Sequence, residues 1–220
     1  MFRITTISLI ITLGISSANA SEQSFQSWDE ACAVAKSIAQ EGDLVFTDIP
    51  NVIFRNVAAS SKTWTSHIGI IFRGDRGEWI VSESKVPLSK EVPLCEFLRN
   101  SSEYLFEIKR FHRPLSPVEI GRLHETADSM LHKLYTFGFD FDSDRMFCSK
   151  FVYLVYQSIG IRAGKLQTFR ELLAENPVSS LTFWKWWFFG RIPWDRRTVT
   201  PASQLRDPQF TSVLKGSSVK

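Results

Sequence analysis

The stretch Ser66-His67-Ile68-Gly69-Ile70-Ile71-Phe72 is an apolar run typical of a buried β-strand. The segment Arg73-Gly74-Asp75-Arg76-Gly77 follows it, and a second strand-like run extends from Glu78 to Ser82. Two such runs joined by a short segment with two glycines predict a β-hairpin. Further strands are expected from Leu44 to Phe46 and from Tyr104 to Phe111.

Helix signals surround this hairpin. Ser27-Trp28-Asp29-Glu30 has the pattern of a capping box, and Ser116-Pro117-Val118-Glu119 combines that pattern with a proline at the first helical position. Helices are expected over four segments: residues 28 to about 40, 117 to about 132, 148 to about 159, and 168 to 175. The segment from Asn51 to Thr65 gives no clear periodicity, and residues after 175 form an aromatic stretch followed by a polar tail.

Length and composition limit the classes of protein. The chain has 220 residues, 44% of them hydrophobic and 22% charged, which is enough apolar material for one well-packed domain. Because no linker divides the sequence, residues 21–220 are expected to form a single domain. A net charge of +3 with scattered basic residues argues against a nucleic-acid partner. Ordinary glycine and proline contents and the lack of repeats exclude collagen-like, disordered and solenoid proteins.

Residues 1–20 have the pattern of a secretory signal peptide. Arg3 supplies the positive start, Ile7 to Ile15 an apolar run, and Ala18-Asn19-Ala20 a cleavage site. The alternative is a membrane anchor, but the apolar run is shorter than the ~20 residues that a spanning helix needs. The mature chain would then begin at Ser21, in the periplasm or outside the cell.

Export to an oxidising compartment makes the three cysteines informative, because disulfides form there. Either Cys32, Cys95 and Cys148 all remain thiols, or two of them pair and one is left free. A disulfide between Cys32 and Cys95 is one hypothesis, for which the sequence supplies no geometry.

Cys148 is the candidate nucleophile. It stands at the start of a predicted helix, where free N–H groups and the helix dipole stabilise a thiolate. Such a thiolate needs an imidazole and a polar group that orients the imidazole. His67 opens a strand among small residues that would let a substrate or another chain approach closely, whereas His112, His124 and His132 are expected in a turn or on a helix face. Glu83 follows the partner strand and can lie opposite or diagonal to His67; its alternative role is a solvated strand end.

Four segments follow, in order, the pattern of a known family: residues 42–46, 64–70, 81–84 and 147–152. The chain resembles YiiX/YebB-like proteins, the permuted branch of the NlpC-type papain-like cysteine hydrolases, over roughly residues 41–205. The resemblance implies an α+β, permuted papain-like fold in which an antiparallel sheet packs against helices, including the helix that carries the nucleophile.

The resemblance also implies roles for individual residues: Cys148 as nucleophile, His67 as base and Glu83 as the group that orients the imidazole. Tyr135 matches a tyrosine that lies near the oxyanion site of family members, where the backbone N–H of Cys148 is the second donor. Two positions depart from the family pattern. Thr136 stands where an aspartate is frequent, and Lys150 stands where a glutamate is frequent, which places a cation close to the nucleophile.

The function expected from the sequence is an exported cysteine hydrolase that cleaves an amide or ester bond through a thioester, as an amidase or peptidase acting on cell-envelope peptide. No cofactor is expected. A metal site is not expected either, because the sequence has no H-E-x-x-H and no paired C-x-x-C motif. Two alternatives remain open. One is a lipid-directed acyltransferase or thioesterase, since acyltransferases similar to lecithin retinol acyltransferase share this core, and the other is a binding protein with an inert Cys148.

The aromatic stretch from Phe183 to Trp194 bears on the choice between a peptide and a lipid. A possible contact with a membrane surface is formed by its residues Trp184, Trp186, Trp187 and Trp194, with Lys185 and Arg191. The alternative is a loop packed over the core or over the cleft. Burial of this kind is the more frequent case, because large aromatic side chains are mostly buried on average.

Overall fold

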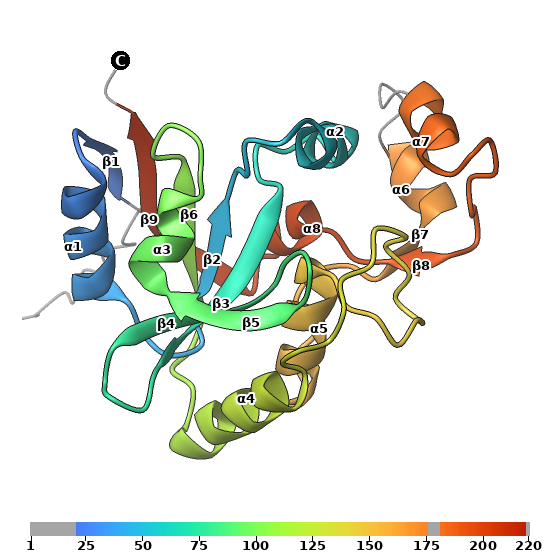
Figure 1. The fold of residues 1–220 in the computed structure, drawn as a ribbon. Coiled ribbons are helices and arrows are strands. Elements are labelled where there is room, and N and C mark those ends of the chain that lie inside the picture. Colours follow the sequence, from blue (N-terminus) through green and yellow to red (C-terminus); the bar gives the residue numbers. More distant parts are fainter. Residues whose placement is uncertain (1–20, 176–180, 219–220) are drawn as a thin grey trace, which may run out of the picture.

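The computed structural model describes residues 21–175 and 181–218, so the predicted signal peptide lies outside the described residues. A sheet of seven strands forms the centre (Figure 1), in the order β1-β9-β6-β2-β3-β4-β5. Its strands are β1 (Ser21–Phe25), β2 (Leu44–Thr47), β3 (His67–Arg73), β4 (Trp79–Ser84), β5 (Ser89–Pro93), β6 (Phe106–Phe111) and β9 (Phe210–Ser218). All neighbours are antiparallel except the edge pair β1 and β9, which is parallel. The predicted α+β class is confirmed.

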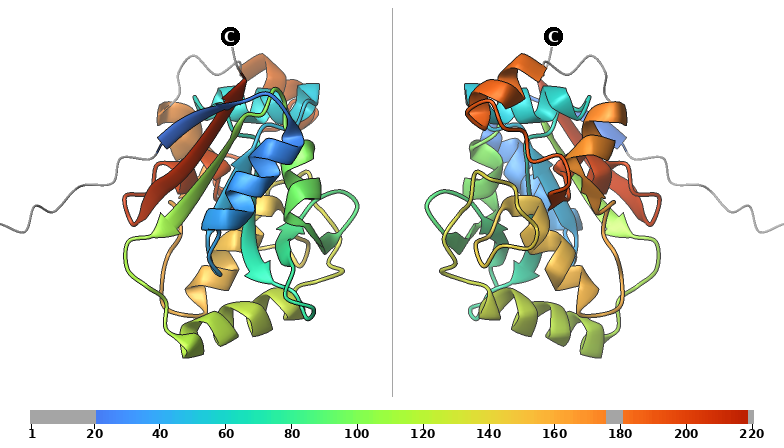
Figure 2. Two further views of the ribbon diagram at one scale, coloured as in Figure 1. Left: turned by 90° about the vertical axis from the view of Figure 1, so that its left-hand side faces the viewer. Right: turned by 90° about the vertical axis from the view of Figure 1, so that its right-hand side faces the viewer.

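Helices cover both faces of the sheet. α1 (Trp28–Ile38) and α3 (Leu94–Arg99) pack on one face, and α4 (Pro117–Ser129) and α5 (Cys148–Gln157) on the other. In Figure 2, α1 lies in front in the left panel, and α5 is seen on the opposite side of the sheet in the right panel. Successive residues of β2 enter opposite cores: Val45 packs with α1 and α3, and Leu44 and Phe46 pack with α5. This double burial explains why the central strands are continuous apolar runs.

A lobe beyond α5 forms a third hydrophobic cluster (Figure 1). It contains β7 (Gln167–Thr168), α6 (Phe169–Glu175), α7 (Leu181–Trp187) and β8 (Arg197–Thr198), next to α2 (Val52–Ser60) and α8 (Pro201–Leu205). Trp184 of α7 is 1% exposed and donates a hydrogen bond of 3.1 Å from its indole nitrogen to Ser60 Oγ. This contact ties α7 to α2. In the described part of the chain, no helix has the length and hydrophobicity needed to cross a bilayer.

The capping signals mark helix starts correctly. Ser116 and Glu119 form a complete capping box at α4. Ser27 Oγ accepts from the backbone N–H of Glu30, but the Glu30 carboxylate accepts from the backbone of Gln26 rather than from Ser27. The backbone N–H that the Glu30 carboxylate caps is therefore that of Gln26, one residue before the position that the capping box predicts.

The described residues contain six elements that were not predicted: β1, β5, β7, β8, α3 and α8. Three further elements occupy longer segments for which no helix or strand was expected. The polar tail contains β9, which pairs with β6 and β1, and the aromatic stretch contains α7 rather than only a loop. The segment without periodicity contains α2, whose N-cap is Asn51. β9 escapes prediction because most of its residues are polar or small, so its strand character comes from long-range pairing rather than from local pattern.

Cys32 on α1 and Cys95 on α3 meet where the two helices pack, and both are free thiols. Burial, together with hydrogen bonding to Cys95, raises the pKa of Cys32 to about 12. The structure thus brings the two residues of the hypothetical disulfide together without a bond between them.

Candidate active site

Cys148 is the first residue of α5 and is 4% exposed. The preceding residue, Phe147, has an extended backbone (φ −144°, ψ 159°), and its side chain does not cap the helix. The N–H groups of the first turn of α5 are therefore not taken up by a capping side chain and can stabilise negative charge at the sulfur or at a bound oxyanion. Because α5 packs against β3, Cys148 is held at the sheet end where β3 begins.

His67 and Glu83 form a buried pair beside Cys148. His67 is the first residue of β3, and Glu83 lies on β4 opposite Gly69, which is diagonal to His67 and one of the two predicted positions. His67 Nε2 and Glu83 Oε2 are hydrogen bonded, and the two residues are 3% and 1% exposed. The ring of Phe97 stacks on the imidazole at 5.3 Å between centroids. Glu83 is therefore a buried partner of His67 and not a solvated strand end.

The charges of this pair follow from its contacts. Burial by itself lowers the pKa of His67, but hydrogen bonding with Cys148 and Glu83 outweighs burial and raises that pKa to about 9. Burial raises the pKa of Glu83, but the hydrogen bond and the charge of His67 reverse this effect and leave the pKa lowered. At neutral pH the pair is an imidazolium and a carboxylate. Since Nε2 contacts Glu83, Nδ1 remains as the nitrogen that can exchange a proton with Cys148.

Tyr135 completes the group of predicted residues. Its backbone N–H donates to Pro87 O at 2.9 Å, and the residue forms a bridge with Met146, two positions before Cys148. Its hydroxyl is buried without a well-formed hydrogen bond among the described residues, and the Cys148 thiol lies beside it. Burial and then the neighbouring Cys148 raise the pKa of Tyr135 well above its usual value. The phenol therefore stays protonated and has a proton to donate.

A narrow, mostly apolar cavity lies at Cys148. Side chains from α2, α5, α6, α7 and the segment before α8 line it, among them Phe54, Tyr135, Phe147, Phe169, Trp184 and Val199. Tyr135 was predicted from the family resemblance, whereas Phe54 and Phe169 have no local signal that separates them from ordinary core residues. The aromatic stretch does pack at this cavity, as the second interpretation of that stretch predicts.

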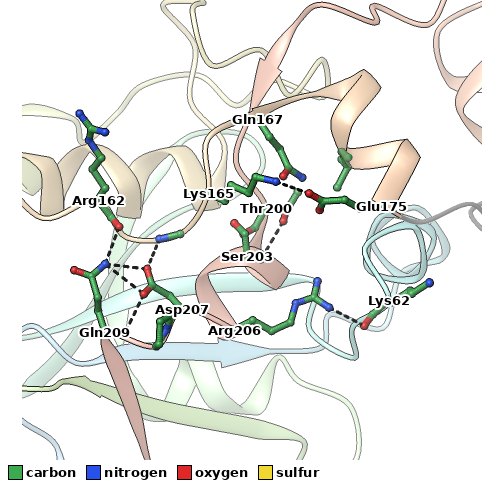
Figure 3. A pocket seen from close by; sticks show the side chains of 13 residues that line it. Lys62, Arg162, Lys165, Gln167, Glu175, Thr200, Ser203, Arg206, Asp207 and Gln209 are labelled. Carbon is green, nitrogen blue, oxygen red and sulfur yellow. Dashed lines mark hydrogen bonds and ion pairs between the residues drawn. The ribbon is translucent and has the colours of Figure 1, made fainter.

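A wider, polar depression of about 1240 Å³ adjoins the cavity, because Leu172 and Thr200 line both. Figure 3 shows its side chains, with Thr200, Ser203 and Lys165 near its centre. Four cations and two acids line it: Lys62, Arg162, Lys165, Arg206, Glu175 and Asp207. Glu175 pairs with Lys165, and the Asp207 carboxylate accepts backbone N–H groups from Gly164 and Gln209. The excess of positive charge faces solvent in this depression.

Packing contacts decide how two neighbours of the site are used. Lys150 points away from the cavity, because its amine donates to the backbone carbonyls of Ser143 and Arg145. The space above Gly69 is filled, since a Cβ there would meet Val81 Cγ1 at 2.4 Å and Phe97 Cε2 at 3.2 Å. Lys150 therefore holds the loop before α5, and Gly69 serves packing of the sheet against α3 rather than approach of a substrate.

Comparisons with known proteins agree with this arrangement. The sequence model of the permuted papain-like amidase enzymes, the YaeF/YiiX or C92 family, matches residues 38–214. The chain is 27% identical over 177 residues to the uncharacterized protein YiiX of Escherichia coli strain K12, covering 80% of this chain and 86% of that protein. It is also similar to the crystal structure of metalloprotein yiiX from Escherichia coli O157:H7, with a TM-score of 0.74 and 27% identity, over 81% of this chain and 98% of that one.

The relative of known structure is described as a metalloprotein. Within residues 21–175 and 181–218, this chain has no group of three or more His, Cys, Asp or Glu side chains arranged to hold a metal ion. The site consists instead of a thiol at a helix start, a buried imidazole with its carboxylate, and a protonated phenol. With its sheet, its chain order and 177 matched residues, the chain belongs to the permuted papain-like amidases of the C92 family.

Proposed function

We propose that this protein is an exported cysteine hydrolase that cleaves an amide bond of a cell-envelope peptide through a thioester on Cys148. The observation that carries the proposal is the buried His67–Glu83 pair next to a cysteine at a helix start. A helix N-terminus and a neighbouring imidazolium both favour the thiolate, which is the attacking form of cysteine.

The proposed first half of the reaction forms the thioester. Cys148 Sγ attacks the carbonyl carbon, and the resulting oxyanion accepts hydrogen bonds from the backbone N–H of Cys148 and the hydroxyl of Tyr135. His67 then gives its Nδ1 proton to the leaving amine nitrogen while the C–N bond breaks. The positive charge of His67 is thereby lost in the same half-reaction in which the thiolate is consumed.

The second half releases the acid. A water molecule gives a proton to neutral His67 as its oxygen attacks the thioester carbon, and the same two donors hold the second oxyanion. The C–S bond then breaks, and Cys148 leaves as a thiolate beside the restored imidazolium. Throughout both halves, Glu83 stays ionised and stabilises the imidazolium, so it positions and charges His67 without touching the substrate.

The charged side chains of the depression beside the cavity support a peptide substrate with ionised groups. The depression beside the cavity carries an excess of cations, which suits the carboxylates of a peptide. The apolar cavity supports a second candidate, an acyltransferase or thioesterase that takes an acyl chain. A binding protein with an inert Cys148 is the third candidate, and it differs from the other two in predicting an unreactive thiol.

The test is hydrolysis of defined substrates by the full chain. Wild type, Cys148→Ala and the matched control Cys95→Ala are incubated with peptides released from cell wall and, separately, with long-chain acyl thioesters and phospholipids. Mass spectrometry identifies the products. The proposal expects peptide amide cleavage by wild type and Cys95→Ala only. Cleavage of the acyl substrates alone supports the second candidate, and equal cleavage by Cys148→Ala contradicts the nucleophile.

A further inference from the structure

α7 and the turn after it expose large aromatic side chains to solvent. Trp186 is 69% exposed and Phe189 is 95% exposed, Phe137 in the same groove is also exposed, and so is Leu181 at the start of α7. We call these four residues, with Lys185 and Arg191, the aromatic surface. Isolated apolar residues on a protein surface need no explanation, but a contiguous aromatic patch marks a surface that contacts another apolar phase.

Only part of the aromatic stretch belongs to this surface. Trp184, which the sequence placed in a membrane contact, is 1% exposed and packs into the third cluster. Trp187 is half-buried and donates from its indole nitrogen to Phe137 O at 2.9 Å. Trp184 and Trp187 therefore form the base, and Trp186 and Phe189 face outward.

The backbone holds Phe189 in its exposed position. Phe189 has a φ of 51°, in the left-handed region that a bulky residue rarely adopts, and Gly190 follows with a φ of 84°. The backbone N–H of Gly190 donates to Lys185 O at 2.6 Å, which closes the end of α7. A phenylalanine kept outward by such a turn is organised for contact before any partner binds.

The charges around these aromatics have one sign. The shallow groove formed by Phe137, Gly138, residues 185–191 and Arg196 includes three cations and no acid. Arg196 is engaged by Asp140 and by Gly138 O, whereas Lys185 and Arg191 are exposed and have no ion-pair partner in the described part of the chain. Tryptophan and phenylalanine flanked by Lys and Arg match the interface of an anionic bilayer, where rings enter the headgroup region and cations contact phosphates.

We propose that the aromatic surface docks the protein on the surface of an anionic phospholipid bilayer. The same lobe supplies wall residues of the cavity at Cys148, since Trp184 stacks on Phe188 and packs edge-on against Phe169. Docking therefore brings the cavity close to the membrane. This inference concerns binding and stands independently of the proposed hydrolysis, because none of the docking residues is assigned to the reaction.

Vesicle co-sedimentation of the Cys148→Ala chain tests the proposal without turnover. Vesicles are made of phosphatidylcholine alone or with added phosphatidylglycerol. Binding to the phosphatidylglycerol vesicles is expected, and Trp186→Ser/Phe189→Ser in the same background should lower the partition coefficient about tenfold or more. Lys185→Glu/Arg191→Glu should weaken binding to the anionic vesicles and remove its dependence on salt. All chains begin at Ser21, the N-terminus expected for the exported protein, so residues 1–20 contribute no vesicle binding.

Matched controls separate docking from folding. Trp194→Ser removes a tryptophan that lies outside the groove, and Arg76→Glu reverses a cation on the β3–β4 turn. Both should bind vesicles as the parent does, and all variants should unfold at the parent's temperature. The proposal is overturned if the parent binds neither kind of vesicle, which is the result expected of a surface that contacts a protein or a second copy of this chain. It is also overturned if vesicle binding survives substitution of both Trp186 and Phe189.

Discussion

Glu83 reaches His67 diagonally across the β3–β4 pair, from the position opposite Gly69. Both side chains are buried, so the carboxylate acts on the imidazole without much screening by water. The pair raises the pKa of His67 to about 9 and keeps Glu83 ionised.

Glu83→Gln should lower the pKa of His67. The amide keeps a hydrogen-bonding group but removes the negative charge, so the imidazolium loses its counter-charge and its pKa falls below about 9. Hydrolysis should fall by up to about 10⁴-fold, as for the orienting carboxylate of a catalytic triad, since Glu83 acts through His67. NMR titration of the His67 ring measures the shift. Glu41→Gln, beside the partly exposed His124, is the control and should leave the His67 titration unchanged. An unaltered His67 titration in Glu83→Gln contradicts this role.

Stability should depend on pH through the same pair. The pKa of His67 is raised from 6.5 to about 9, so its contribution is complete below about pH 6.5 and is lost as the pH rises through 9. The pKa of Glu83 is lowered from 4.5, so its contribution is present above pH 4.5 and is lost as the pH falls through its lower folded value. The raised pKa of His67 corresponds to a loss on the order of 3 kcal/mol on the alkaline side.

Urea unfolding at several pH values measures this dependence. The double variant His67→Phe/Glu83→Leu replaces the pair with apolar side chains and gives the baseline from all other groups. The free energy of unfolding of wild type, relative to this variant, should decline between pH 6.5 and 9. A difference that is flat over that range contradicts the raised pKa of His67.

Tyr135→Phe should reduce turnover without reducing stability. The hydroxyl of Tyr135 has no well-formed hydrogen bond, so its removal leaves no buried group unpaired. Loss of one oxyanion donor should lower kcat by about 10²-fold to 10³-fold. Tyr156→Phe is the contrast, because Tyr156 Oη donates to the buried Gly42 O. That variant should lose about 1–3 kcal/mol of unfolding free energy and keep the chemistry of the site. Equal kcat values for Tyr135→Phe and wild type would remove Tyr135 from the mechanism.

Local signals predicted the central elements. The hairpin of β3 and β4, the helix that Cys148 begins and the capping box at Ser116 are each specified by residues close in sequence. These same elements carry His67, Glu83 and Cys148. The local pattern left the roles of His67 and Glu83 open, and the family resemblance supplied the combination of the three residues.

Long-range packing decided the parts that sequence did not predict. β9 joins β6 and β1, and its Gly216 leaves room for Phe106, since a Cβ there would meet Phe106 Cε1 at 2.3 Å. Nothing near Gly216 in sequence indicates this contact. Likewise, the direction of Lys150 depends on the carbonyls of a loop, and the division of the aromatic stretch into buried and exposed residues depends on the position of α2.

The rate of alkylation of Cys148 tests the central claim most directly. Wild type and His67→Ala are treated with iodoacetamide at about pH 6, where an isolated thiol is almost fully protonated. Mass spectrometry follows labelling at each cysteine, and Cys32, whose pKa is raised to about 12, is the internal control. The account predicts fast labelling of Cys148 in wild type and at least tenfold slower labelling in His67→Ala, with Cys32 unreactive in both. Equal rates at Cys148 in the two proteins would contradict a thiolate coupled to His67.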